Sequence, residues 1–168
     1  MKDIKAIEII MLKSFKTLIK VCIFNFLIVF NVYAFNYKDF NQNVKNFNQK
    51  LIIFNENGDE IAKYKVAVAD DSEKRHYGLM NLRKMASENG MLFLFKDHAI
   101  INMWMKNTLI PLDMIFIDND KIAYIHRRAK PNDLSIISSV YEVDKVLEVN
   151  GGEVDIKKIK IGQKIILK

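Results

Sequence analysis

Residues 90–118 hold most of the side chains that could bind a ligand. Those side chains are Trp104, Lys106, Asn107, Thr108 and Asp113. Because side chains alternate between the two faces of a strand, Trp104 and Lys106 are expected on the same face. An indole offers an apolar surface for stacking, an ammonium offers a charge, and amide and hydroxyl groups offer directional hydrogen bonds. The pattern predicts a small pocket for an anionic or sugar-like ligand.

Asp113 has two interpretations. Beyond the corner at Pro111 it could return to the pocket and pair with Lys106 or with Arg75, which we place at the rim. It could instead tie the turn by accepting hydrogen bonds from backbone amides. A Trp-x-Lys pair at a strand end is also common in plain packing, where the ammonium reaches out to solvent. A pocket and a purely structural corner therefore both stay open.

Catalysis is the alternative to a non-catalytic ligand-binding or interaction module. A hydrolase or transferase would use Asp113 as acid or base and Lys106 to stabilise developing charge. Asp113 and Glu148 could also form a carboxylate pair. The usual nucleophiles are missing, since the one cysteine is Cys22 in the N-terminal segment and no serine has a nucleophile-elbow context. We therefore expect binding.

Metal and cofactor sites find little support in the sequence. His76, His98 and His126 are scattered without metal-ligand spacing, and each is expected at the surface or in a turn. Met103 and Met105 share one strand face, and a pair of thioethers suits Cu(I), so copper binding is a further alternative. Methionines at such spacing usually fill a core. We expect no cofactor.

The N-terminus has the pattern of a secretory signal peptide over residues 1–34. Lysines precede a short apolar run at residues 21–32, and Val32 and Ala34 stand at the −3 and −1 positions of an expected cleavage site. Met11 would serve equally well as the start. Since spanning a bilayer takes roughly 20 apolar residues, we expect an exported protein, periplasmic or secreted. An uncleaved membrane anchor is the alternative.

The charge balance argues against a nucleic-acid partner. Of the net charge of +6, residues 1–34 contribute +3 (five lysines minus two acidic residues), which leaves +3 for the rest of the chain. Basic residues cluster at residues 126–130 and 157–160, without interleaved aromatic residues. The expected partner is a small anionic or polar ligand, or another protein.

Residues 35–57, rich in Asn, Gln and Phe, predict a loosely ordered extension that tightens into a strand at 51–54. A single β-rich domain is expected over residues 58–168. Further strands are predicted at residues 61–68, 91–95, 100–105, 113–117, 121–126, 146–149 and 165–167, with a turn at 96–98, a loop at 131–139 and short helices at 72–78 and 151–159. The fold class predicted is mainly β (β-rich α+β), a small barrel-like sheet with one or two short helices, and an α+β sheet is the alternative.

Several separated motifs resemble those of the family called domain of unknown function 192. They are Gly78-Leu79-Met80, Gly90-Met91-Leu92-Phe93 with Phe95, Trp104-Met105-Lys106-Asn107-Thr108, Pro111-Leu112-Asp113, Phe116-Ile117-Asp118 and Leu147-Glu148-Val149, followed by Gly151 or Gly152 and by Gly162. The resemblance covers residues 60–167 and implies a small, mostly β domain, often exported in bacteria, with no established activity. Met103 departs from the pattern, where an aromatic residue is usual, and the turn after Asp118 lacks the usual glycine.

Overall fold

The computed structural model describes residues 18–29 and 46–168. These two parts belong to separate compact units of the chain. Residues 18–29 are helical and lie within the segment expected as a signal peptide. Among the described residues, no helix is long and apolar enough to cross a membrane. The expected cleavage position after Ala34 and residues 35–45 lie outside the described residues.

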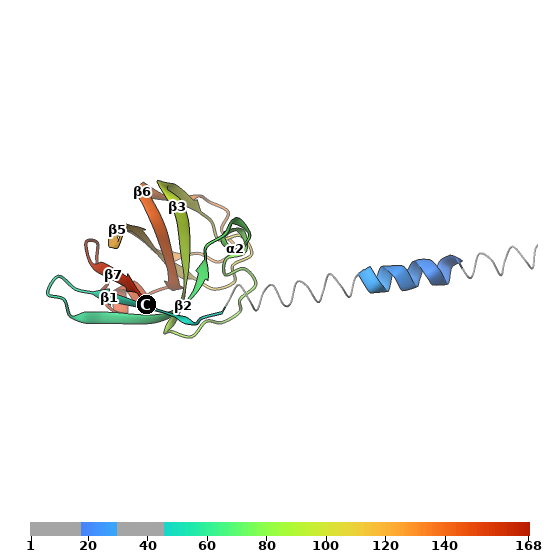
Figure 1. Cartoon of the computed structure of the whole chain (residues 1–168), viewed down its shortest axis with the longest axis horizontal. Helices are drawn as coiled ribbons and strands as arrows, with labels where there is room; N and C mark the ends of the chain where they lie inside the picture. The colour runs from blue at the N-terminus through green and yellow to red at the C-terminus, as the bar shows by residue number, and fades with distance from the viewer. Residues whose placement is uncertain (1–17, 30–45) are drawn as a thin grey trace, which may run out of the picture. The chain divides into compact units, whose positions relative to one another are not determined.

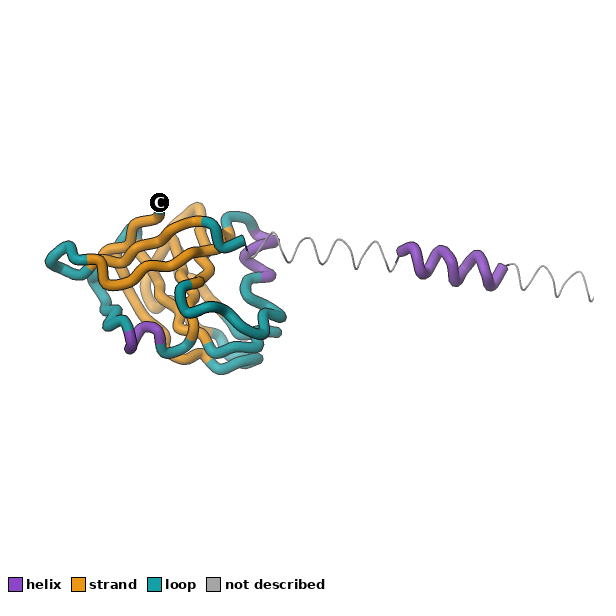
Figure 2. Tube along the Cα trace, turned by 90° about the horizontal axis from the view of Figure 1, so that it is seen from below, coloured by secondary structure: helices purple, strands orange, loops and turns teal. Residues whose placement is uncertain are grey.

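The second part is built around a closed β-barrel (Figure 1 and Figure 2). Round the barrel, the strand order is β1-β2-β3-β6-β4-β5-β7. The strands are β1 Gln49–Phe54, β2 Glu60–Ala69, β3 Asn89–Met103, β4 Leu112–Asp118, β5 Lys121–Ala129, β6 Ile137–Asn150 and β7 Lys164–Leu167. Two short helices accompany them, α2 Ser72–Tyr77 and α3 Glu153–Ile156. The prediction of a mainly β, barrel-like fold is confirmed.

One face of each strand fills the interior of the barrel. Leu92 on β3 pairs with Leu147 on β6, which pairs in turn with Ile115 on β4. Paired positions lie on the same face of a sheet, and these three residues belong to one buried cluster together with Tyr64 and Val154. Removing this apolar surface from water is the main source of stability for the domain.

The outer face of β3, β6 and β4 is buried as well. Met91, Glu148 and Met114 form one row across the three strands, and Phe93 and Phe116 belong to the next row. Alternation places both rows opposite the interior residues, yet all five side chains are buried. Another segment must therefore cover part of this outer face.

That segment is the connection between β2 and β3, which are parallel and therefore need a crossover. It contains α2, whose first turn is capped by Asp71, with the carboxylate accepting a 2.7 Å hydrogen bond from the Lys74 amide. The helix ends at Gly78 with φ 49, a conformation that favours glycine. A Cβ there would lie 3.3 Å from Cζ of Phe93, so the crossover packs directly on the outer face.

β3 runs unbroken through residues expected to form a turn. It is one strand, Asn89–Met103, so the predicted turn at residues 96–98 and the division into two strands are wrong. The pairing with β6 moves from Leu94↔Lys145 to Ala99↔Val143, and residues 95–98 bulge opposite a single residue of β6. Residues 96–98 are exposed, which explains their polar side chains without a chain reversal.

Two further elements have bounds different from those expected. β1 begins at Gln49 and is a barrel strand, although residues 35–57 were expected to be loosely ordered up to residue 51. β6 begins at Ile137, so residues 137–139, expected as loop, are strand. The buried Ser139 hydroxyl accepts a 3.0 Å hydrogen bond from the Ile101 amide, which supports the pairing where the β3–β6 register is irregular.

Candidate functional site

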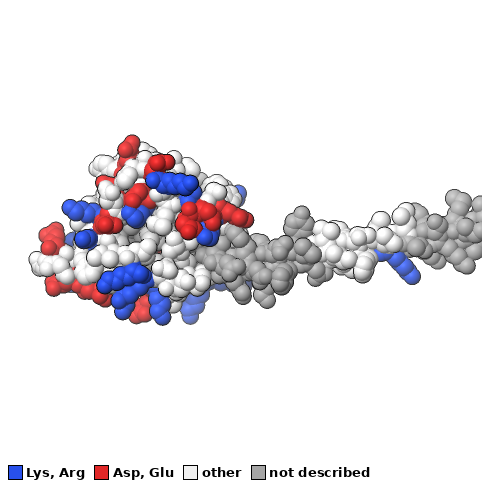
Figure 3. All heavy atoms as spheres, viewed as in Figure 1, with Lys and Arg blue, Asp and Glu red and all other residues white. Residues whose placement is uncertain are grey.

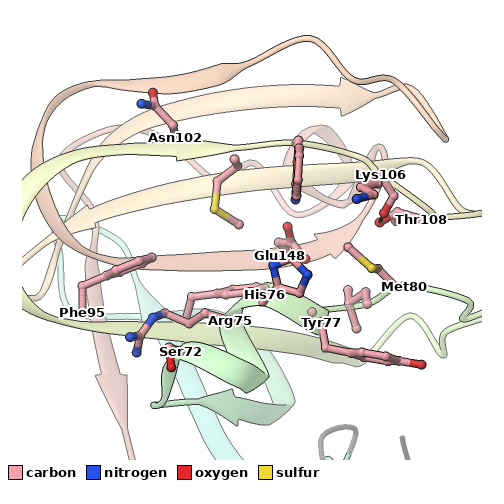
Figure 4. Close-up of a pocket in the computed structure, with 15 residues that line it drawn as sticks. Ser72, Arg75, His76, Tyr77, Met80, Phe95, Asn102, Lys106, Thr108 and Glu148 are labelled. Atoms are coloured by element: carbon pink, nitrogen blue, oxygen red, sulfur yellow. Dashed lines mark hydrogen bonds between the residues drawn. The ribbon is translucent and has the colours of Figure 1, made fainter. Parts of the chain in front are cut away.

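A pocket of about 330 Å³ lies on the outer side of the barrel wall (Figure 4). Its lining comes from α2 and residues 78–80, from the end of β3 and the residues that follow it, and from Glu148 on β6. Met80, Phe93, Met103 and Trp104 give it an apolar surface. A cavity of this size with a few polar groups suits a small organic molecule.

Glu148 supplies a carboxyl group at the floor of the pocket. Its side chain is 4% exposed, and its partners in register on β3 and β4 are Met91 and Met114. Within residues 18–29 and 46–168, no hydrogen bond or ion pair engages this carboxyl. Burial raises the pKa of Glu148 to about 8, because the ionised form loses its solvation. The carboxyl group is therefore protonated at neutral pH and can donate a hydrogen bond.

Trp104 and Lys106 both line the pocket, although they follow the end of β3 at Met103 and are not part of a strand. The Lys106 ammonium lies 5.0 Å from the centre of the Trp104 ring, a cation–π distance. His76 of α2 approaches the same ring edge-on, with ring centres 6.3 Å apart. Trp104 is 39% exposed, so it forms a wall of the opening. In Figure 4, His76 and Glu148 lie near the centre of the pocket, with Lys106 to one side.

Arg75 lies at the rim, on α2. Its Nη1 donates a 2.9 Å hydrogen bond to the carbonyl of Leu94, and its guanidinium lies 5.3 Å from the centre of the Phe95 ring. These two contacts hold the side chain against the barrel wall. Its charge therefore stays beside the pocket, which it lines.

Thr108 and Asn107 have different places. Thr108 lines the pocket and is buried, and its hydroxyl donates a 3.4 Å hydrogen bond to the Lys106 carbonyl. Asn107 lies outside the lining. It has φ 54, a value that asparagine tolerates better than most residues, and its carbonyl accepts a 2.8 Å hydrogen bond from the Asn81 amide. Asn107 therefore shapes the loop that presents its neighbours.

Asp113 belongs to the barrel and lies outside the pocket lining. It is fully buried, and its carboxylate accepts hydrogen bonds from three backbone amides: 2.8 Å from Arg128, 2.9 Å from Gly152 and 2.9 Å from Val154. These bonds tie β4 to β5 and to the turn before α3. The expected pairing of Asp113 with Lys106 or Arg75 is wrong, and the alternative, a corner tied through backbone amides, is what the structure shows.

Met103 and Met105 are both buried, at 9% and 0% exposure. Met103 lines the pocket, whereas Met105 does not. The backbone of Met105 fixes the loop, because its amide donates a 2.9 Å hydrogen bond to the Asp133 carbonyl and its carbonyl accepts one of 3.0 Å from the Thr108 amide. Copper binding by the two thioethers stays an untested prediction.

A second group of polar side chains lies where the β3 bulge, the interior of β6 and the end of β4 meet. Ligand atoms of His98, Asp118 and Asp144 come within 4.8 Å of one another, so His98 is not isolated in space as its sequence position suggests. His98 Nε2 lies 3.0 Å from Asp118 Oδ1. The Lys145 ammonium lies 2.5 Å from Asp144 Oδ2, so a cation of the protein already offsets part of the negative charge.

A comparison with protein families matches residues 52–167 to the family described as "DUF192: Uncharacterized ACR". The chain belongs to this family. The resemblance in the sequence motifs is thereby confirmed, and the match extends back into β1, beyond residue 60.

Two solved structures are similar to this DUF192 chain. One, from Sinorhizobium meliloti 1021 and described as a candidate transcription regulator, is 37% identical with a TM-score of 0.68, covering 70% of this chain and 92% of the other. The second, a protein of unknown function from Novosphingobium aromaticivorans DSM 12444, is 30% identical with a TM-score of 0.66, covering 70% and 83%. Comparison with curated proteins found no match.

Four of the motifs that resemble the DUF192 family, at residues 78–80, 90–95, 104–108 and 147–149, contribute residues to the pocket. Their residues in its lining are Gly78, Leu79, Met80, Phe93, Phe95, Trp104, Lys106, Thr108 and Glu148. Sequence reasoning missed Glu148 as a pocket residue, since it considered Glu148 only beside Asp113. His76 is exposed, as expected, and also lines the pocket. The available signal was the position of Glu148 within a run of core-type residues, Val146 to Val149.

The surface charge of the barrel is mixed. Figure 3 shows Lys and Arg side chains interspersed with Asp and Glu on the face in view. Ion pairs such as Lys74–Asp70 and Arg128–Asp155 account for part of this pattern. That the protein has no nucleic-acid partner stays a prediction.

Proposed function

We propose that this protein is a non-catalytic binding module that takes a small molecule with a polar head and an apolar body into the pocket above Glu148. The observation that carries the proposal is the Glu148 carboxyl, 4% exposed at the pocket floor and without a hydrogen-bond partner in the part of the chain that the structure describes. A carboxyl that is desolvated by burial and has no partner loses part of its hydrogen bonding with water, and a complete loss costs about 1–3 kcal/mol. A ligand that forms a hydrogen bond with the carboxyl recovers this free energy. A methionine at this position would pack without this cost.

The surroundings of Glu148 support a ligand of mixed character. Trp104 and Phe93 offer ring surfaces for an apolar body. Lys106 and Thr108 bring an ammonium and a hydroxyl to the same cavity. Sites for small molecules typically combine a mostly apolar lining with a few polar groups in this way.

The experiment that tests the proposal is a thermal-shift screen of the purified protein against small carboxylates, amines, alcohols, sugars and phosphates. A ligand at about 100 times its Kd adds roughly 2.7 kcal/mol to stability, which raises the Tm by several degrees. The shift should disappear in Lys106→Ala and persist in the control Lys130→Ala, an exposed residue outside the pocket. A shift that survives in Lys106→Ala would place the ligand elsewhere.

Catalysis is a second candidate function, and one observation favours it. A pKa of about 8 suits Glu148 to exchange protons near neutral pH. Glu148 therefore replaces Asp113 as the candidate general acid or base, since the Asp113 carboxylate accepts hydrogen bonds from three backbone amides. If the site is catalytic, Glu148→Gln keeps ligand binding and loses turnover of the same ligand; retained turnover would exclude the role.

We also propose that the protein is exported, periplasmic or secreted, with an uncleaved membrane anchor as the alternative. The support is the basic, apolar and small-residue pattern of residues 1–34. Cell fractionation with N-terminal sequencing tests it. A mature N-terminus at Phe35 in the exported fraction is expected, whereas a membrane-bound protein that retains Met1 or Met11 would indicate the anchor.

A further inference from the structure

The charged groups around Glu148 are unevenly distributed. Along the described chain, Glu148 is the only acidic residue in the pocket lining. The other titratable side chains in the lining are Arg75, His76 and Tyr77 of α2 and Lys106 of the loop after β3, and the Arg75 guanidinium is turned toward Leu94 and Phe95. The strands on either side of Glu148 present Met91 and Met114 in register, so β3 and β4 bring no charge to the carboxyl.

Neither cation of the pocket is neutralised by an acidic side chain. Lys106 contacts the Trp104 ring, and Arg75 contacts the Leu94 carbonyl and the Phe95 ring. No ion pair to either cation is formed in residues 18–29 and 46–168. A cleft lined by one sign of charge against apolar walls concentrates ions of the opposite sign. The pocket therefore favours a negatively charged ligand.

The Glu148 carboxyl, at the floor of the pocket, complements a negatively charged ligand when this carboxyl is protonated. Burial that raises the pKa of Glu148 to about 8 leaves the carboxyl neutral at physiological pH. A neutral carboxyl donates one hydrogen bond, and a bond between a carboxyl and an anionic oxygen is among the stronger kinds. In Figure 4, Glu148 and Lys106 face the same space from different sides.

We infer that the ligand is a small organic carboxylate with an apolar body, whose head group is held between the Lys106 ammonium and a protonated Glu148 carboxyl while its body contacts Trp104 and Phe93. The inference rests on the proposed binding function of this pocket. It adds that the ligand binds while Glu148 holds its proton. The binding of the anion is therefore coupled to the binding of a proton by Glu148.

This coupling has a definite sign. An anion that needs Glu148 protonated binds with constant affinity below the pKa of the free carboxyl and more weakly above it, since ionised Glu148 repels the head group. The affinity falls tenfold for each pH unit above that pKa, and by reciprocity the bound anion raises the pKa of Glu148. A cationic ligand would show the opposite sign and bind more tightly as Glu148 ionises.

Isothermal titration calorimetry of the purified full chain between pH 6 and pH 9.5 tests the inference with three probes of similar shape: benzoate, benzyl alcohol and benzylamine. Benzoate should bind best, with a Kd that rises about tenfold per pH unit above pH 8. Glu148→Gln, which keeps a hydrogen-bond donor, should bind benzoate within about fivefold of the wild type at pH 7 and lose the decline above pH 8. Lys106→Met should weaken benzoate binding at least tenfold, and Lys130→Met should leave it unchanged.

The outcomes separate the inference from the function on which it rests. Tighter binding of benzylamine, strengthening as the pH rises, would overturn the carboxylate ligand and retain the binding pocket. A benzoate Kd with the same pH dependence in Glu148→Gln would overturn the role of Glu148. If none of the probes binds and the wider thermal-shift panel is also flat, the proposed binding function fails together with the inference.

Discussion

Asp113 and Glu148 lie one position out of register on neighbouring strands, Asp113 opposite Val149 and Glu148 opposite Met114. Since successive residues of a strand point to opposite faces, the two carboxyl groups lie on opposite sides of the barrel wall. Asp113 is satisfied by three backbone amides, while Glu148 opens onto the pocket. The carboxylate pair considered from the sequence therefore cannot form.

Replacing Asp113 by alanine should destabilise the barrel strongly. Three buried amides would lose their acceptor, and each unsatisfied donor costs about 1–3 kcal/mol. We expect a loss of at least about 3 kcal/mol in the free energy of unfolding, measured by urea denaturation. Asp118→Ala, at the exposed end of the same strand, is the control and should cost less than about 1 kcal/mol. Equal losses in the two variants would contradict the assigned role of Asp113.

Glu148 should make the stability of the protein depend on pH. The unfolded carboxyl loses its proton near 4.5 and the folded one near 8, so between these values the folded state holds one more proton. Stability therefore falls as the pH rises from about 4.5 to about 8, by up to the order of 5 kcal/mol.

Glu148→Gln removes this dependence, because glutamine does not ionise. Urea unfolding at pH 5 and pH 9 measures the effect. The variant should match the wild type within about 1 kcal/mol at pH 5 and exceed it by several kcal/mol at pH 9. Parallel profiles for the two proteins would show that the folded carboxyl titrates in its ordinary range.

Trp104 should matter less for stability than its size suggests. It is 39% exposed, whereas Phe93 across the pocket is 2% exposed. We expect Trp104→Ala to cost about 1–2 kcal/mol in thermal or urea unfolding and Phe93→Ala about 3–5 kcal/mol, as a core deletion. A larger loss for Trp104→Ala than for Phe93→Ala would mean that the indole is a core element and not a wall of the pocket.

Gly90 allows β3 and β6 to approach closely beside the pocket. A Cβ there would lie 2.8 Å from the Glu148 carbonyl oxygen, so Gly90→Ala should separate the strands and cost about 1–3 kcal/mol in urea unfolding. Gly58→Ala provides a contrast, because nothing lies within 4 Å of its Cβ position while its φ is +86. That variant should show only backbone strain, on the order of 1 kcal/mol.

The barrel architecture was predictable because its signals are local. Alternation along residues 61–68 and a short apolar run at residues 114–117, between Pro111 and the turn at 118–120, are visible in the sequence, and the corresponding strands β2 and β4 are present. Alternation also placed Trp104 and Lys106 on one side, and their burial still alternates beyond the end of β3 at Met103. The bulge at residues 95–98 could not be predicted, since exposed polar residues look the same in a bulge and in a turn.

The floor of the pocket could not be predicted, because the place of Glu148 depends on tertiary contacts. In Leu147-Glu148-Val149 the sequence reads as a strand with its acidic residue facing solvent. Two non-local facts reverse this interpretation: β6 lies between β3 and β4, and the α2 crossover covers their outer face. The α2 crossover buries the Glu148 carboxyl, and this burial keeps the carboxyl protonated. Neither the protonation state nor the position of Glu148 is therefore a property of the local sequence.

The barrel closes through β1 and β7, whose outermost backbone groups bond in both directions, Lys50 N to Lys168 O at 3.1 Å and Lys168 N to Lys50 O at 2.7 Å. During synthesis β1 leaves the ribosome long before β7, so a nascent chain has an incomplete ring until residues 164–167 emerge. Until then its unpaired strand edges can pair with other chains. The pairs that close the ring join residues far apart in the sequence, so the complete barrel should form slowly and only after translation has ended.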